Sequence, residues 1–575
     1  MRKQTKLVAV ASAAALLAIG ASMTSFAATG WVEEDGVWYY YDKDGNKVED
    51  EWKKSGDNWY WLDSEEAGAM AVDKLVEDDD DLYYVDANGV MVRNTWVKVV
   101  NEDQDDDEDP AEYNYYYMQS NGKAYKAGDS GETKFKTIDG KRYAFDEDGK
   151  MLYGWVNEDS TRATDDSDWE TATYYCGSWE DGAMKTGWQK VTVYDQDEDE
   201  DMDYWFNFKS NGKKRFLADD SEDVVLEKKI NGKRYGFDGR GVMTYEWTVA
   251  STATTSSTEA WKYFSDPEDG ARKTKGWFKV VAPTEDTTFG DYNGSFAETD
   301  ADDEAERWYY ADGDGELAVA QIKKINGKYY GFRPDDGKKG GAMLTGLCAL
   351  TVKGDEITKV WAADMDADDL DDCMDDEGDF EGFADAEDTT LFYFGNDEDT
   401  DGAMKTGSVT VSLDGDSYQF MFSKSGGAEG KGRGMTGIYD EKYVYKHGLK
   451  LKADSDEKYI VVYATGDTSD DTSVVDDLDS SDIRKVAVEA GQNKDGDTVK
   501  WVGDVDLKNW GEDYYLLNTS GSIVKNKTAA KDGDDWYFYV EDKNIVMYTN
   551  NKTLSDDIDD GYKMDVNLSD WKDWN

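Results

Sequence analysis

The chain has 575 residues and a formal net charge of −63, because 127 acidic residues outnumber 64 basic ones. So acidic a surface repels phosphate backbones and anionic lipid headgroups, which excludes nucleic acid and membrane surfaces as expected partners and favours cationic ligands. Aromatic residues make up 14% of the chain, with 55 Gly and only 4 Pro, a mixture typical of short strands joined by tight turns. The single histidine, His447, and the scattered cysteines Cys176, Cys348 and Cys373 predict neither imidazole-based hydrolysis, nor a zinc site, nor a disulfide framework.

The first 27 residues have the features of an export signal. Basic residues precede an apolar run from Leu7 to about Gly20, and small residues lead up to Ala27. We expect cleavage after Ala27 and therefore secretion. Since neither the C-terminus nor any other stretch predicts an anchor or a membrane span, we expect retention at the cell surface to come from binding.

From residue 28 to about 450 one phrase recurs along the chain. It consists of Gly-Trp or a variant, a polar turn, an aromatic cluster, a turn with Asp or Asn before Gly, and Gly-x-Met. In the first copies Trp31 and Trp52 are 21 residues apart, as are Trp38 and Trp59. Gly-x-Met ends seven copies, at Met70, Met91, Met151, Met184, Met243, Met343 and Met404. One hairpin of about 20 residues cannot bury enough surface to be stable alone, so the repetition predicts hairpins that stack and share their aromatics.

A shorter unit alternates with the long one. Ile-Asp-Gly-Lys or Ile-Asn-Gly-Lys precedes a basic residue and Tyr at Ile138, Ile230 and Ile325. Asn-Gly and Asp-Gly favour two-residue hairpin turns, so each copy predicts a strand, a tight turn and an aromatic strand.

Long acidic inserts interrupt the longer hairpins, and we expect them to be solvated loops. They span residues 101–112, 195–203, 251–259 and 283–306. The acidic run 105–109 suggests a calcium site, but it lacks the spaced ligands, central Gly and distal Glu of an EF-hand. We therefore expect a charged loop without a metal.

The repeat resembles the choline-binding, or cell-wall-binding, repeat of Gram-positive surface proteins. Gly-Ala-Met-Lys-Thr-Gly-Trp at 182–188 and Gly-Ala-Met-Lys-Thr-Gly at 402–407 match that family's pattern clearly. The resemblance covers most of residues 30 to 440 and returns weakly near Trp536. Related repeats in clostridial toxin tails and glucan-binding enzymes bind carbohydrate, so the motif predicts the architecture better than the ligand.

The resemblance implies boxes of aromatic residues from adjacent hairpins, often with a Met, that hold a choline headgroup. A quaternary ammonium cannot donate hydrogen bonds, so ring faces attract it through cation–π contacts worth ~0.5 to 2 kcal/mol each. Carried onto this chain, the boxes draw on Trp31, Trp38, Trp52, Trp59, Trp96, Trp155, Trp188 with Trp205, Trp247 with Trp261, Trp277 with Trp308, and Met184. For any one of them the alternative is shared core, which is the commoner role of an aromatic in a stacked hairpin. Leu347, Ser408 and Ile438 stand where Trp is expected, which predicts that those hairpins keep structure and lose binding.

We therefore predict an all-β solenoid of stacked β-hairpin repeats with long acidic loop insertions. The predicted parts are a signal peptide (1–27), a cell-wall-binding hairpin array (28–450), an acidic, irregular β-rich segment (451–512) and degenerate C-terminal repeats (513–575). Because no stretch of about 100 residues free of the repeat offers a core for catalysis, we expect neither an enzyme nor a cofactor.

The predicted function is noncovalent attachment to a bacterial cell-wall polymer, a choline-bearing teichoic acid or a glycan, by a secreted protein held at the cell surface. Several weak sites joined in one chain would give strong overall attachment. Two alternatives stay open. The chain is a secreted glucan-binding protein, since aromatics also stack on sugars, or it is the anchor of a wall-modifying enzyme whose chemistry lies in residues 452–575.

Overall fold

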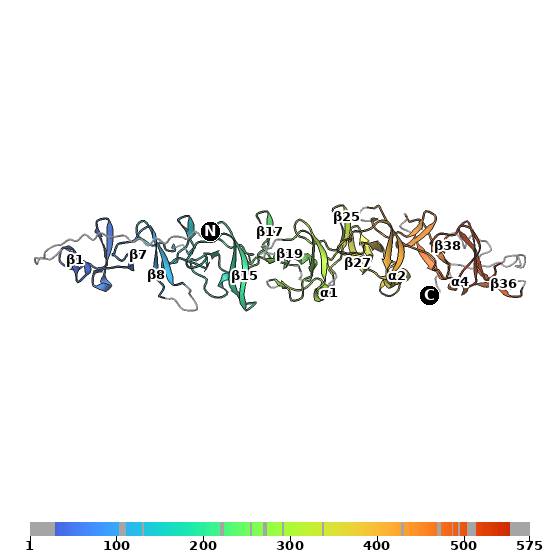
Figure 1. The fold of residues 1–575 in the computed structure, drawn as a ribbon, viewed down its shortest axis with the longest axis horizontal. Helices are drawn as coiled ribbons and strands as arrows, with labels where there is room; N and C mark the ends of the chain where they lie inside the picture. Colours follow the sequence, from blue (N-terminus) through green and yellow to red (C-terminus); the bar gives the residue numbers. More distant parts are fainter. Residues whose placement is uncertain are drawn as a thin grey trace. The chain divides into compact units, whose positions relative to one another are not determined.

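The computed structural model describes residues 29–102, 111–128, 131–218, 223–253, 256–267, 273–289, 292–335, 339–426, 430–468, 473–485, 487–492, 495–502 and 513–552. The predicted signal peptide and the acidic run 105–109 lie outside these residues. The chain divides into two compact units, one made of Met1–Tyr245 with Asp266–Arg272 and the other of Glu246–Ser265 with Lys273–Asn575. Strands dominate both units (Figure 1) and the predicted all-β class is confirmed.

The first unit is a series of antiparallel hairpins, most of them formed by strands adjacent in sequence. Its elements are β1 (Gly30–Glu34), β2 (Val37–Tyr41), β3 (Glu51–Ser55), β4 (Asn58–Asp63), η1 (Ser64–Glu66), β5 (Ala69–Met70), β6 (Lys74–Asp78), β7 (Asp81–Val85), β8 (Thr95–Val100), β9 (Tyr113–Met118), β10 (Lys136–Ile138), β11 (Lys141–Tyr143), β12 (Trp155–Val156), η2 (Asp168–Glu170), β13 (Tyr174–Tyr175), β14 (Gly187–Asp195), β15 (Glu200–Phe208), β16 (Lys228–Ile230) and β17 (Lys233–Tyr235). The predicted turns Asp-Gly at 139–140 and Asn-Gly at 231–232 connect β10 to β11 and β16 to β17, with positive φ at all four residues.

The second unit begins with similar hairpins and continues into larger sheets. Its elements are β18 (Trp247–Val249), η3 (Thr258–Ala260), β19 (Trp261–Tyr263), β20 (Gly276–Val281), β21 (Thr288–Phe289), β22 (Tyr292–Asn293), α1 (Glu298–Asp302), β23 (Glu306–Ala311), β24 (Gln321–Ile325), β25 (Lys328–Phe332), β26 (Leu347–Lys353), β27 (Glu356–Ala363), α2 (Ala367–Asp375), η5 (Gly378–Phe380), β28 (Thr389–Tyr393), β29 (Gly407–Leu413), β30 (Asp416–Phe422), β31 (Gly437–Tyr439), β32 (Tyr443–Lys446), β33 (Leu449–Lys450), β34 (Tyr459–Ala464), β35 (Val475–Leu478), α4 (Ser480–Lys485), β36 (Val488–Gln492), β37 (Thr498–Val502), β38 (Tyr514–Asn518), β39 (Lys527–Lys531), β40 (Tyr537–Glu541) and β41 (Asn544–Thr549). Strands β34 to β41 form one eight-stranded sheet. The predicted boundary between residues 512 and 513 therefore runs through a single sheet.

Neighbouring hairpins are joined by a recurring backbone hydrogen bond. The residue that ends each Gly-x-Met copy, which we call the Met position, donates its N–H to a carbonyl of the preceding hairpin. Met91 donates to Trp59 at 2.9 Å, Met151 to Tyr115 at 2.7 Å, Met243 to Trp205 at 2.9 Å and Met343 to Trp308 at 2.9 Å. Each hairpin therefore depends on its neighbour for a backbone partner, as a stack of interdependent repeats requires.

In several repeats the glycine two residues before the Met position supports the side chain at the preceding Met position. A Cβ on Gly182 would lie 2.3 Å from Sδ of Met151, and one on Gly212 would lie 2.4 Å from Sδ of Met184. Both glycines have positive φ, so two separate constraints exclude a side chain there. The Met of one repeat thus lies on the bare backbone of the next.

Two of the inserts expected as solvated loops are ordered parts of the fold. The segment 195–203 extends β14 and β15 to nine residues each, and Asp195 is buried because Tyr204 and Arg240 donate to its carboxylate. The segment 283–306 includes α1 and brings Phe296 into the core with no exposed surface. Local polarity was a poor guide because single buried groups, not average composition, hold these segments in place.

None of the described helices is of a length and apolar character that could span a bilayer.

The contact between Met and Gly predicts a specific loss of stability. Gly182→Ala forces both a left-handed Ala and a clash with Met151, so we expect a cost of about 2 to 4 kcal/mol. Gly154 is the matched control, because it has φ +65° and no atom within 4 Å of a Cβ. Gly154→Ala should cost only the backbone part, about 1 kcal/mol. Equal losses for the two variants in thermal unfolding would contradict the packing role.

Candidate functional site

A group of four side chains recurs where one hairpin meets the next, and we call it an aromatic corner. The first member is a Trp at the start of a hairpin's first strand. The second lies on the second strand, two residues before the Trp's cross-strand partner. The third is an aromatic residue of the next hairpin, and the fourth occupies the Met position that ends that hairpin. In the corner that begins with Trp188 on β14, the other members are Trp205 on β15, Tyr235 on β17 and Met243.

The contact between the first and third members is nearly constant along the chain. The ring centroids lie 5.2 Å apart for Trp31 and Tyr60, 5.1 Å for Trp52 and Tyr83, 4.8 Å for Trp96 and Tyr143, 5.0 Å for Trp155 and Phe206, 4.6 Å for Trp188 and Tyr235, 5.4 Å for Trp247 and Tyr309, and 4.8 Å for Trp277 and Tyr330. Each predicted first-strand Trp therefore contacts its neighbouring hairpin, so these residues hold the stack together whatever else they do.

Two corners share a further geometry. The indoles of Trp188 and Trp205 lie 6.4 Å apart at 83°, and those of Trp277 and Trp308 lie 6.3 Å apart at 81°. All four are half-buried. Two ring faces at right angles, with a tyrosine from the next hairpin, form a three-sided aromatic surface. Among the described cationic side chains, none lies over any of these four indoles.

Three corners near the N-terminus have no perpendicular indole pair among the described ring contacts. They comprise Trp31, Trp38, Tyr60 and Met70; Trp52, Trp59, Tyr83 and Met91; and Trp96, Tyr115, Tyr143 and Met151. Their Trp residues are half-buried. Within the described ring contacts, neither Trp31 with Trp38 nor Trp52 with Trp59 forms a pair. The sequence therefore predicted the register of these Trp residues correctly, but the structure shows no contact between the two indoles of such a corner.

The corner of Trp247 is part of the core. Trp247 is 7% exposed, while Trp261 and Tyr309 have no exposed surface. Phe296, from the ordered segment 283–306, packs against Trp247 at 5.1 Å between ring centroids, and Leu317 takes the Met position. Trp247 and Trp261, predicted as a box, therefore present no ring face to a ligand.

The corner of Trp155 contains a charged side chain that the sequence reasoning missed. Lys214 takes the Met position, with its N–H 2.7 Å from the carbonyl of Thr173. Its Nζ donates to the carbonyls of Trp169 and Glu170, both at 2.8 Å, and lies 5.2 Å from the ring centroid of Trp155. Lys214 is 1% exposed, and burial lowers the pKa of its amine to about 7. The available signal was the register, since Gly-Lys-Lys at 212–214 stands where Gly-x-Met is expected.

Met184, the one methionine predicted as a box member, belongs to no Trp corner. Its N–H donates to the carbonyl of Arg142, and its side chain lies against Gly212. In the register of β10 and β11 the first-member position falls to Phe135 instead of a Trp, and the ring of Phe135 lies 5.0 Å from that of Tyr174 on the next hairpin. Met184 therefore packs between hairpins without closing a Trp corner.

Carboxylates bind the indole edges of two corners. Nε1 of Trp308 donates to Asp399 at 2.9 Å, and Nε1 of Trp52 donates to Asp78 at 3.1 Å. The pKa of Asp399 is lowered, first by the hydrogen bond from Lys279 and then by that from Trp308. A carboxylate that stays ionised beside the rings attracts a cation to the corner.

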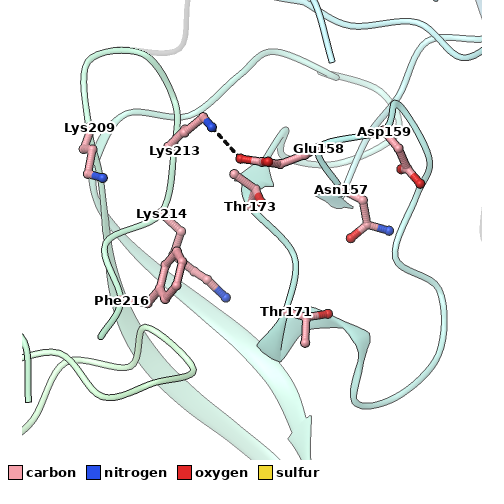
Figure 2. A pocket seen from close by; sticks show the side chains of 9 residues that line it. All are labelled: Asn157, Glu158, Asp159, Thr171, Thr173, Lys209, Lys213, Lys214 and Phe216. Atoms are coloured by element: carbon pink, nitrogen blue, oxygen red, sulfur yellow. Dashed lines mark hydrogen bonds and ion pairs between the residues drawn. The ribbon is translucent and has the colours of Figure 1, made fainter. Parts of the chain in front are cut away.

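A polar hollow of about 630 Å³ lies beside the Trp155 corner. Figure 2 shows its lining, with Lys213 paired to Glu158 on one side and the ring of Phe216 next to Lys214. Phe216 is 45% exposed. Asn157, Thr171 and Thr173, together with the charged Asp159 and Lys209, complete the lining.

Comparisons with known proteins give structural neighbours but no family model and no curated relative. Three similar solved structures come from Streptococcus pneumoniae. The modular autolysin LytC, in complex with a synthetic peptidoglycan ligand, is 19% identical with a TM-score of 0.29, over 53% of this chain and 51% of LytC. The choline-binding domain of CbpL is 22% identical with a TM-score of 0.25, over 43% of this chain and 98% of that domain. Choline binding protein F, in the presence of a peptidoglycan analogue, is 15% identical with a TM-score of 0.25, over 74% of this chain and all of that protein.

Two of these neighbours, CbpL and choline binding protein F, are named for choline binding, the property of the family that the repeat resembles. The chain matches about half the length of LytC. At these TM-scores the likeness does not by itself decide the function.

The buried amine of Lys214 predicts a pH dependence. Folded, its pKa is about 7, whereas the ordinary value is 10.5. Between these values the unfolded chain holds the proton and the folded chain does not, so the contribution of Lys214 to stability rises with pH. We expect the unfolding free energy of the wild type relative to Lys214→Met to rise between pH 7 and pH 10 by on the order of 3 to 4 kcal/mol. Lys229→Met, at an exposed position on β16, is the control for the loss of a lysine, and a flat difference for Lys214→Met would contradict the predicted shift.

Proposed function

We propose that the chain is a secreted binding protein that attaches to a bacterial cell wall by holding quaternary ammonium groups of a wall polymer in its aromatic corners. The observation that carries this proposal is the repeated geometry of the Trp188 and Trp277 corners. An indole pair near 80° recurs in both, with a tyrosine 4.6 Å and 4.8 Å from the first indole. Packing alone does not require two half-buried indoles at the same angle in separate repeats.

The corner chemistry suits a cation that has no N–H to donate. Ring faces attract a quaternary ammonium through their quadrupoles, at ~0.5 to 2 kcal/mol for each good contact. The wider excess of acidic residues concentrates cations near the surface without selecting among them.

Repetition supplies what a single corner lacks. Five corners keep half-buried Trp residues and Met at the fourth position, those of Trp31, Trp52, Trp96, Trp188 and Trp277. A polymer that carries many ammonium groups can occupy several at once, and each further contact is effectively intramolecular. Weak corners would therefore produce firm but reversible attachment, without a catalytic step on the wall.

A glycan is the second candidate ligand, and the hollow beside Trp155 favours it. Phe216 offers an exposed ring face, and Asn157, Thr171 and Lys209 offer groups that hydrogen-bond sugar hydroxyls. Sugar sites commonly combine these features. This hollow would serve a wall glycan or a secreted glucan alike.

Removing one indole of a corner should remove one site. We expect Trp205→Ala and Trp308→Ala each to lower the number of tetramethylammonium ions bound per chain by one in calorimetric titration. Trp361→Ala is the control for general loss of packing, since Trp361 packs on the core beside β26 and belongs to no corner. It should leave the number unchanged. A wild-type chain that binds no tetramethylammonium would refute the ammonium proposal.

Elution from choline-bearing cell walls separates the two ligands. If the corners hold the chain, millimolar choline releases it and soluble wall glycan does not. If the hollow holds it, glycan releases it, and Phe216→Ala weakens retention by about tenfold, equal to about 1.4 kcal/mol. Wall turbidity is followed in the same samples. A fall in turbidity caused by the chain would contradict a purely binding role and point to chemistry in residues 452–575.

A further inference from the structure

We propose that Lys214 acts as an internal cation that closes the Trp155 corner to ligand, and that the residue at the Met position therefore sets which corners of this chain bind. This inference rests on the proposed binding of ammonium groups by the aromatic corners. It assigns to Lys214 a role in setting the number of sites.

The position of Lys214 in the repeat is the first support. Its backbone makes the same bond to the preceding hairpin as Met91, Met151, Met243 and Met343 do. Its side chain also lies against the next glycine, since a Cβ on Gly241 would be 2.8 Å from Cδ of Lys214. A lysine in place of the usual methionine therefore leaves the stack intact and changes only the side chain that enters the corner.

The surroundings of Nζ are the second support. The ammonium lies 5.2 Å from the ring centroid of Trp155 and 5.9 Å from that of Phe206, the first and third members of this corner. It also donates to the carbonyls of Trp169 and Glu170. A quaternary ammonium has no N–H and cannot make these two bonds, so the site is built for a primary ammonium on the chain itself.

A second chain cation lies over two further rings of this interface. The guanidinium of Arg240 lies 5.5 Å from the ring centroid of Trp169 and 5.7 Å from that of Tyr204. Asp195 and Asp238 hold it at 2.9 Å and 3.2 Å. Cations of the chain itself therefore lie over Trp155 and Trp169, whereas no described cation lies over Trp188 or Trp277.

Displacing Lys214 would be costly for an external ligand. The competing ammonium is tethered, so its effective concentration at the corner is on the order of millimolar or higher. Its expulsion would also leave two buried carbonyls without a donor. A free ammonium that binds a corner weakly cannot compete under these conditions.

The test exchanges the residues at the Met position. Tetramethylammonium is titrated at pH 6, where the Lys214 amine carries its proton, into the full-length wild type, Lys214→Met and Met343→Lys. We expect Lys214→Met to bind one ion more than the wild type, because no tethered ammonium then lies beside the Trp155 and Phe206 rings. We expect Met343→Lys to bind one ion fewer, because its ammonium reaches the Trp277 and Tyr330 faces. Lys229→Met, an exposed lysine on β16, should match the wild type.

The outcomes separate this inference from the proposed function. A wild type that binds the ion, together with a folded Lys214→Met that gains no site, overturns the role of Lys214 alone. A wild type that binds none overturns the ammonium function, yet a new site in Lys214→Met would still support an internal cation.

A measurement on the wild type covers the case in which Lys214→Met does not fold. With 5-fluorotryptophan incorporated, the fluorine resonance of Trp155, assigned through Trp155→Phe, should not move as tetramethylammonium is added. Resonances of Trp188 and Trp205 should move. A shift of the Trp155 signal equal to theirs would show an open corner and overturn the proposal.

Discussion

The structure depends on the fact that no single hairpin of this chain can bind all its own backbone groups and bury its own aromatic side chains. Each is too small to bury a core and leaves a carbonyl that the next hairpin must bind, and each hairpin that begins with Trp also leaves an indole face for the next hairpin to cover. The N–H at the Met position meets the carbonyl, and the aromatic third member meets the indole at 4.6 to 5.4 Å. Hairpin follows hairpin because these two contacts repeat together.

This arrangement separates architecture from recognition. The bond that joins the hairpins uses the backbone of the Met position, so the side chain there can change without loss of the stack. Met243, Lys214 and Leu317 hold the same place and close their corners in three different ways. The Trp188 corner, with Met243, keeps half-buried indoles. The Trp155 corner is filled by the ammonium of Lys214, and the Trp247 corner, with Leu317, is buried in the core. A repeat protein can in this way adjust its number of sites by single substitutions.

The sequence was sufficient to predict the hairpins, their turns and the register of the Trp residues, because these follow from periodicity and from the φ preferences of Gly, Asn and Asp. It was not sufficient to tell an open corner from a closed one. Trp261 and Trp308 hold the same register, yet Phe296 from a distant insert buries the first. Lys214 was overlooked because a lysine in an acidic chain is normally solvated, and only the three-dimensional stack places its Nζ among carbonyls and rings. Contacts between segments far apart in sequence decide these cases, and a single sequence does not reveal them.

The excess of acidic residues has to be reconciled with aromatic surfaces that attract any cation. The same chain carries 64 basic residues, and their side chains compete with a ligand for the ring faces of the corners. Several ring faces are in fact taken, as Lys359 lies 2.9 Å from the ring centroid of Trp361 and Lys47 lies 3.1 Å from that of Tyr39. Carboxylates restrain other cations, since Lys279 near the Trp277 corner is bound to Asp399 rather than to a ring. The acidic residues therefore have a role in recognition, because carboxylates that bind the chain's own lysines keep those lysines off the indole faces. The faces then stay free for a quaternary ammonium, which has no N–H to donate to a carboxylate.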